Sequence, residues 1–174
     1  GTPVIAGAVI ESLFGRTESA GRSGRFELFC NRDWLCGAAT VATGPALDDL
    51  ARDLYREIFD ATRDRHLVRV WHYVPGINVP GPDGLEQYQA FCRGRSIAFE
   101  QEFGTHFKTQ LPASSAVGCK EPLLTIAFAT SSHQPRHVEN PLQIPAYDYP
   151  GEYGPRAPSF ARATVVPGDG RTAV

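Results

Sequence analysis

Two arginines of this sequence fall where the surrounding pattern predicts burial. The first lies in a predicted helix over residues 84–103, in which residues at intervals of three and four share one face. That face carries Leu85, Tyr88, Cys92, Arg95 and Phe99. A buried guanidinium needs an anion, because leaving it unpaired costs several kcal/mol. Arg95 is therefore expected either to form an internal ion pair, for example with Glu139, or to serve as a fork for a substrate carboxylate beside the Tyr88 hydroxyl.

The second arginine follows a stretch crowded with aromatic, basic and proline residues, 146–162. Proline restricts the backbone, and Tyr and Arg offer planar hydrogen-bond donors, so this composition is typical of a stiff loop that recognises a small anion. A domain hinge with packed aromatic side chains is the alternative, and it suits Tyr147 and Tyr153. Arg162 lies in a predicted strand over 159–166, where an inward arginine again requires a partner.

The elements that must position these residues alternate between strands and helices. Residues 46–62 have apolar positions at helical spacing with charged residues between them, which predicts a helix lying on a sheet. Strands are predicted at 3–10, 26–30, 36–43, 67–74, 123–129 and 159–166, with a further candidate at 142–147 and a mobile loop at 15–25. This order predicts an α+β fold, a mixed sheet with two helices on one face.

Composition narrows the classes of function. The hydrophobic fraction is 42% and the net charge is −2, which fits a globular domain and argues against a nucleic-acid partner. No apolar run approaches the about 20 residues of a membrane span. The four cysteines and five histidines show no zinc or redox spacing, so no metal is expected, and the cysteines are interpreted as reduced thiols in a cytoplasmic protein.

Five segments, taken in order, resemble the chorismatase family. They are residues 70–78, 84–95, 111–118, 139–141 and 149–163. The resemblance covers nearly the whole chain and is weakest before residue 50. It implies a Rid/YjgF-like fold of the chorismate mutase-like type, with an N-terminal domain over 1–156 and the first strand of a second, similar domain over 157–174. Because the chain begins at Gly1 and has no Met, residues are expected to be missing before it. Because it stops just after the Gly/Asp-rich turn at 167–171, where a second strand should begin, residues are expected to be missing after it as well.

The resemblance also implies a site at the junction of two such domains. Tyr88, Arg95, Tyr149 and Arg162 match the family's substrate-binding positions, and chorismate carries two carboxylates that two Arg–Tyr pairs would hold. The family's catalytic glutamate is expected beyond Val174, in the C-terminal half of the same protein, which is supplied either in the same chain or as a separate one. No cofactor is expected.

The implied activity releases pyruvate from chorismate and leaves a dihydroxycyclohexadiene carboxylate or 3- or 4-hydroxybenzoate. Without the catalytic half, the chain alone is expected to be inactive. Two alternatives stay open: a non-catalytic Rid-like module that binds a small carboxylate, and a pteridine-linked oxygenase, for which the histidine spacing offers no iron-ligand set.

Overall fold

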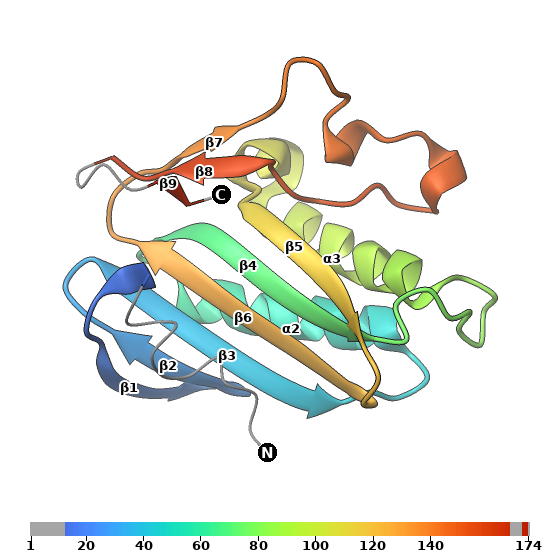
Figure 1. Cartoon of the computed structure of the whole chain (residues 1–174), viewed down its shortest axis with the longest axis horizontal. Helices are drawn as coiled ribbons and strands as arrows, with labels where there is room; N and C mark the ends of the chain where they lie inside the picture. The colour runs from blue at the N-terminus through green and yellow to red at the C-terminus, as the bar shows by residue number, and fades with distance from the viewer. Residues whose placement is uncertain (1–12, 168–171, 174) are drawn as a thin grey trace.

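The computed structural model describes residues 13–167 and 172–173, so the strand predicted at 3–10 lies outside the described residues. Six strands form one mixed sheet in the order β1-β2-β3-β6-β4-β5 (Figure 1). Their bounds are β1 Glu18–Ser23, β2 Phe26–Cys30, β3 Trp34–Ala42, β4 His66–Pro75, β5 Ala113–Cys119 and β6 Leu123–Ser131. Only the β4–β5 pair is parallel among these neighbours, and β5 forms one edge of the sheet.

Both helices, α2 (Leu47–Ala61) and α3 (Gln87–Phe103), cover the same face of this sheet, as predicted (Figure 1). The apolar stripe of α2 is largely buried, with Leu54, Tyr55 and Ile58 at 0% exposure, because it packs against β4, β6 and α3. Gly94 allows α3 to lie directly against α2, since a Cβ there would collide with the backbone of Asp48. The two helices and the sheet therefore enclose one principal core.

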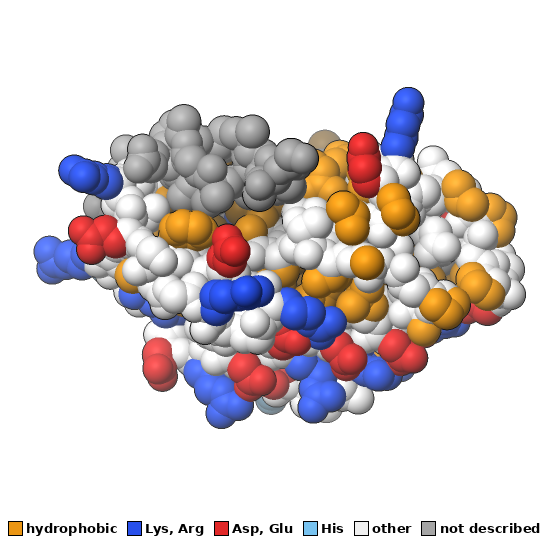
Figure 2. Space-filling model, turned by 90° about the horizontal axis from the view of Figure 1, so that it is seen from below, with side chains coloured by type: hydrophobic (Ala, Val, Ile, Leu, Met, Phe, Trp, Pro, Cys, Tyr) orange, Lys and Arg blue, Asp and Glu red, His pale blue; other side chains and the backbone are white. Residues whose placement is uncertain are grey.

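The opposite face of the sheet carries a smaller cluster. Its buried members are Phe14, Trp34, Cys36, Val68, Ala129 and Val166. The outer side of α2 carries exposed ion pairs, such as Asp49–Arg52 and Asp60–Arg63. Viewed from below, acidic and basic side chains intermingle along one edge of the molecule, with hydrophobic side chains gathered above them (Figure 2).

Neither of the two edge strands of the sheet, β1 and β5, was predicted from the sequence. Residues 15–25 contain β1, not only a mobile loop, because Glu18–Ser23 pairs with β2 through a register shift between Ser19 and Gly21. β5 was missed altogether, since ASSAVGC is rich in small residues and Val117 is its one branched side chain, so the usual signal of a strand is weak there.

A second, small sheet lies beside the start of β5 (Figure 1). Its strands are β7 Arg136–Val138, β8 Ala163–Val165 and β9 Thr172–Ala173, in that order and antiparallel (Figure 1). The strand predicted at 159–166 is therefore shorter than expected. Residues 142–147 form no strand, and 3-10 helices occur instead at Ala146–Asp148 and Gly151–Tyr153, where prolines interrupt the chain. The domain boundary at 156/157 stays a prediction.

No helix in the part of the chain that the structure describes is long and apolar enough to cross a membrane.

Candidate functional site

Arg95 lies on the buried face of α3, with only 4% of its surface exposed. Its Nη2 donates a hydrogen bond of 2.8 Å to the Ser114 hydroxyl on β5. Its guanidinium carbon lies 5.2 Å from the centroid of the Tyr55 ring and 5.6 Å from that of Phe99. The Nε nitrogen is buried and has no hydrogen-bond partner. The Ser114 hydroxyl and the two rings thus hold the guanidinium in place, while its Nε–H donor is left without an acceptor.

The ion pair suggested for Arg95 and Glu139 does not form. Across residues 13–167 and 172–173, no carboxylate makes an ion pair with Arg95. Aromatic rings and the neutral hydroxyls of Ser114 and Tyr55 do not neutralise a buried charge, so the desolvation cost of this guanidinium is only partly offset within the described chain. A bound anion would complete its partners.

Tyr88 begins the same helical face and lies half-buried one turn before Cys92. Burial raises the pKa of the Tyr88 hydroxyl, and the neighbouring Cys92 thiol adds to this effect, whereas the charge of Arg95 opposes it. The phenol therefore stays protonated at physiological pH and remains a hydrogen-bond donor. The charge of Tyr149 also acts on Tyr88, which connects α3 to the second predicted pair.

Arg162 and Tyr149 form that second pair. Nη2 of Arg162 donates a 2.7 Å hydrogen bond to the Tyr149 hydroxyl, and its guanidinium carbon lies 5.5 Å from the centroid of the Phe160 ring. As in Arg95, the Nε nitrogen is buried without a partner. Arg162 lies just before β8 and not inside a strand, so the alternation expected of a strand does not set its direction.

Glu139 lies close to Arg162 without forming an ion pair. The backbone of Arg162 hydrogen-bonds its carboxylate, while Oε2 is buried and unpaired. Burial raises the pKa of Glu139, and the charge of Arg162 works in the opposite direction. The guanidinium of Arg162 is therefore influenced by one carboxylate but not saturated by it.

The start of β5 brings the two arginines to the same region. Ala161 forms a parallel bridge with Ala113, and the Ala161 amide donates to the Pro112 carbonyl at 3.0 Å. Arg162 follows Ala161 in the chain, and Ser114, the hydrogen-bond partner of Arg95, follows Ala113. Arg162 and Ser114 therefore occupy neighbouring positions. The neighbouring amide of Ala113 is bonded to the Thr164 hydroxyl at 3.0 Å, which fixes β8 at this point.

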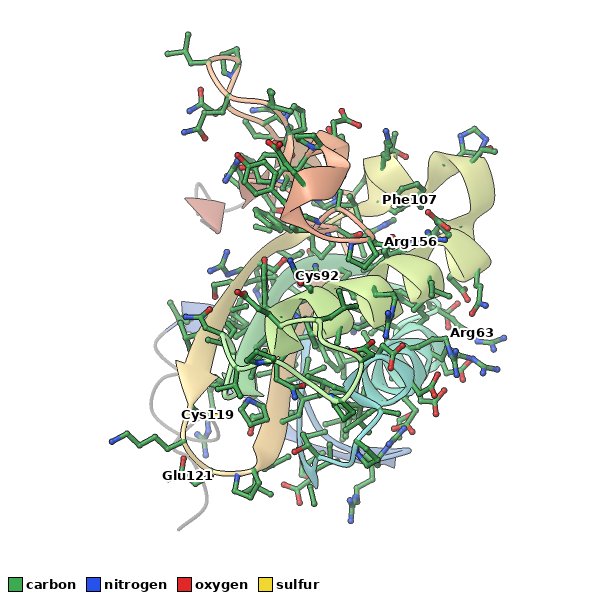
Figure 3. The ribbon with its side chains drawn as sticks, turned by 90° about the vertical axis from the view of Figure 1, so that its right-hand side faces the viewer. Arg63, Cys92, Phe107, Cys119, Glu121 and Arg156 are labelled. Atoms are coloured by element: carbon green, nitrogen blue, oxygen red, sulfur yellow. The ribbon has the colours of Figure 1, made fainter. Side chains whose placement is uncertain are left out.

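The segment that carries Tyr149 is attached to α3 and to the 3-10 helix Gly104–Gln110 at three points. Lys108 pairs with Asp148 at 2.6 Å, Gln89 donates to the Tyr153 carbonyl at 3.3 Å, and Arg156 forms an ion pair with Glu100. Figure 3 shows Arg156 between this segment and α3. The proline-rich stretch is thus a tethered loop above α3.

Three residues around Arg95 were not predicted from the sequence: Tyr55, His72 and Ser114. Tyr55 is one more member of the apolar stripe of α2, and His72 alternates with valines in β4, so neither position differs from ordinary core positions. Ser114 lies on the strand that sequence patterns missed. The only signal in the sequence was that Tyr55 and His72 each put a polar group at a position where the pattern of α2 or β4 predicts burial.

A cavity of about 140 Å³ lies elsewhere, at the ends of α2 and α3. Phe59, Phe99 and Phe103 form part of its wall, and its lining contains none of the four predicted binding residues. Within the described ranges 13–167 and 172–173, no three His, Cys, Asp or Glu side chains gather as a metal site requires.

Comparisons with known proteins agree with this architecture. Residues 13–130 match the family model described as chorismatase FkbO/Hyg5-like, N-terminal. A 3-hydroxybenzoate synthase of Streptomyces hygroscopicus is 36% identical over 143 residues, covering 77% of this chain and 40% of the relative. A chorismatase of Streptomyces rapamycinicus is 39% identical over 136 residues, covering 76% of this chain and 40% of the relative.

A crystal structure of a chorismatase superposes with a TM-score of 0.80 at 32% identity, covering 86% of this chain and 46% of that one. The chain thus spans about 40% of the length of the curated relatives it matches. The resemblance predicted from the five segments is confirmed, whereas the Rid/YjgF assignment stays a prediction. With the matching model covering most of its length, the chain belongs to the FkbO/Hyg5-like chorismatase N-terminal family.

Proposed function

We propose that this chain is the substrate-clamping part of a chorismatase. The whole protein would convert chorismate to pyruvate and either a dihydroxycyclohexadiene carboxylate or 3- or 4-hydroxybenzoate. In this proposal Arg95 and Arg162 each hold one carboxylate of chorismate, and Tyr88 and Tyr149 donate hydroxyl hydrogen bonds to it. Arginine suits this role because its planar fork matches a carboxylate with two parallel bonds.

The observation that carries the proposal is the state of Arg95. It is 4% exposed, it makes no ion pair within the described residues, and its Nε has no partner. Arg162 repeats this pattern beside the same stretch of β5. Two such cations, each accompanied by a tyrosine, suit a small dianion better than a monoanion.

The chemistry itself requires a proton donor. Protonation of the enol ether methylene makes the ether carbon electrophilic, and water adds to it to give a hemiketal. The hemiketal then breaks its bond to the ring oxygen, which takes a proton and stays on the ring as a hydroxyl, and pyruvate leaves with its keto group formed. A general acid with a raised pKa performs such a step. We assign this role to a glutamate beyond Val174, in a second Rid-like domain of the same protein, and we assign no residue of this chain to it.

We further propose a cytoplasmic location, with chorismate as the partner and neither nucleic acid nor membrane involved. All four cysteines, Cys30, Cys36, Cys92 and Cys119, are free thiols, which suits a reducing compartment. Burial raises the pKa of Cys92 to about 11 and that of Cys36 to about 12, so neither behaves as a reactive thiolate.

The direct test is to incubate the full-length gene product with chorismate and to follow pyruvate release while identifying the second product. Pyruvate together with a diene acid or a hydroxybenzoate supports the proposal. No pyruvate at any chorismate concentration, from a protein that is folded, would overturn it.

The alternative is a non-catalytic module that binds a small carboxylate. One observation favours it: the buried Nε atoms of Arg95 and Arg162 have no partner, and anion binding without any reaction would be enough to satisfy them. Calorimetric binding of chorismate by the full-length protein, with no pyruvate formed over hours, would identify this alternative.

A further inference from the structure

Arg95 is one member of a closed circuit of buried contacts that joins four elements. From Arg95 on α3, one contact leads to the Ser114 hydroxyl, 2.8 Å away. Another leads to the ring of Tyr55 on α2, 5.2 Å from the guanidinium carbon. The Tyr55 hydroxyl lies 2.6 Å from Nε2 of His72 on β4, and Nδ1 of His72 lies 2.7 Å from the Ser115 carbonyl. The circuit closes because Ser114 and Ser115 are neighbours on β5.

The direction of each hydrogen bond in this circuit follows from chemistry. A carbonyl oxygen only accepts, so Nδ1 of His72 carries the proton. Burial, and then the charges of Arg95 and Arg69, hold the pKa of His72 well below its ordinary value, so the ring is neutral. Nε2 is therefore an acceptor, and the Tyr55 hydroxyl must donate to it. The remaining lone pairs of the Tyr55 oxygen are then free to face a cation.

Tyr55 is placed to use those lone pairs on Arg95. The residue is 0% exposed, and burial raises the pKa of its hydroxyl, whereas the charge and hydrogen bonding of Arg95 oppose that rise. His72 is 1% exposed and packs edge-on against Phe91 at 4.9 Å between ring centroids. Packing holds both side chains in place, so removing one would allow the other to shift.

We infer that Tyr55 and His72 are positioning residues, which hold the Arg95 guanidinium in one orientation for the carboxylate it would bind. This inference rests on the proposed function. An arginine side chain has many rotamers, and fixing it before binding removes an entropic cost that binding would otherwise meet. Neither Tyr55 nor His72 would touch the substrate, so both would act through Arg95.

The test uses the full-length gene product with Tyr55→Phe, His72→Leu and His72→Gln. Tyr55→Phe keeps the ring under Arg95 but removes the hydroxyl, and His72→Leu removes the acceptor that orients it. We expect each to raise KM for chorismate about fivefold, which corresponds to one hydrogen bond, with a smaller change in kcat. His72→Gln offers an oxygen near the position of Nε2 and should restore most of the affinity.

The double variant Tyr55→Phe/His72→Leu should be no worse than either single variant, because both changes break the same circuit. Phe59→Leu is the matched control: it lies on the same helix as Tyr55 and packs on Phe99 at 5.0 Å, but it is not one of the two rings under the Arg95 guanidinium. It should lower the melting temperature and leave KM unchanged. Full addition of the two single effects, or a KM rise in Phe59→Leu equal to theirs, overturns the inference.

A structural measurement separates this inference from the proposed function. In a crystal structure of Tyr55→Phe, the Arg95 guanidinium should leave Ser114 or occupy two positions. A single Arg95 conformer that keeps its bond to Ser114 overturns the inference, whether or not the protein acts on chorismate. If Arg95→Ala leaves chorismate turnover intact, the proposed clamp fails instead. If Tyr55→Phe does not fold, the His72→Leu and His72→Gln pair decides the question.

Discussion

Ala161 pairs with Ala113 in a parallel bridge, and this single backbone contact places the two halves of the candidate site side by side. Arg162 follows Ala161 and Ser114 follows Ala113. Arg162 therefore lies beside Ser114, whose hydroxyl accepts a hydrogen bond from Arg95. Residues separated by almost fifty positions in sequence thereby share one edge of the sheet. The predictions below depend on that arrangement.

Replacing Arg95 by Ala should lower kcat/KM of the full-length protein for chorismate by roughly thirtyfold to several thousandfold. This corresponds to about 2–5 kcal/mol, the range for removing one member of a desolvated charge pair. Arg95→Lys should recover only part, because an ammonium lacks the planar fork. Tyr88→Phe should cost about 1 kcal/mol.

Arg93→Ala is the matched control for Arg95. Arg93 lies on the same helix but pairs with Asp48 and Asp83 on the surface. Steady-state kinetics with chorismate should show no change in kcat/KM for it. A kcat/KM within twofold of the unmodified protein for folded Arg95→Ala would mean that Arg95 is structural only.

Tyr149→Phe should weaken binding of chorismate by about 1 kcal/mol, because it removes the 2.7 Å hydrogen bond that fixes Arg162 and the donor offered to the substrate. Tyr153→Phe is the control, since Tyr153 is 61% exposed and the substitution keeps its ring, which packs on Tyr149 at 5.5 Å between centroids. Calorimetry with chorismate would compare the two. Equal effects would remove Tyr149 from the site.

Breaking the tethers of the loop should affect substrate affinity more than stability. The Lys108–Asp148 and Arg156–Glu100 pairs are substantially exposed, and such pairs contribute about 0–1 kcal/mol each. The double variant Lys108→Ala/Arg156→Ala should therefore melt within a few degrees of the unmodified protein but show a raised KM. High salt should produce the same KM rise in the unmodified protein. A large loss of stability with unchanged KM would contradict a positioning role for the loop.

His137 should make folding stability depend on pH. Burial, followed by the charge of His66, lowers the pKa of His137 to about 4 from its ordinary value of 6.5. The unfolded chain therefore binds a proton that the folded chain does not, and stability is full above pH 6.5 and falls as the pH drops toward 4. One such proton changes the free energy of unfolding by up to about 1.4 kcal/mol per pH unit.

Chemical denaturation of His137→Gln between pH 7 and 4 should show a flatter profile than the unmodified protein. His106→Gln, at an exposed position, should leave the profile unchanged. Parallel curves for the unmodified protein and His137→Gln would refute the assignment to His137.

The 174 residues alone should release no pyruvate from chorismate, because the proposed acid is not among them. Pyruvate release by this piece, purified from a host that lacks any related enzyme, would show that the chemistry lies within residues 1–174. The full-length product is the positive control.

Periodicity in the sequence was sufficient for the main elements. The helix over 46–62 and the strand over 67–74 were predicted within about two residues. The helix has apolar positions at helical spacing with charged residues between them, and the strand is a run of branched and aromatic residues. Two helices on one face of a mixed sheet follow from the order of these elements. β5 and β1 escaped prediction, because small and polar residues become strands there only through pairing with their neighbours.

The candidate site divides in the same way. The positions of Arg95 and Arg162 were predicted from the sequence because a cation among apolar or aromatic residues is rare enough to notice, and the chorismatase resemblance rested on residues readable in order. Whether Arg95 pairs with Glu139 was open, since a helical pattern indicates which face a side chain occupies but not what lies opposite. Only the tertiary structure decided that Ser114, Tyr55 and His72 surround Arg95 and that the loop with Tyr149 folds back over α3. Such partners come from elements far apart in the chain, and no local period encodes them.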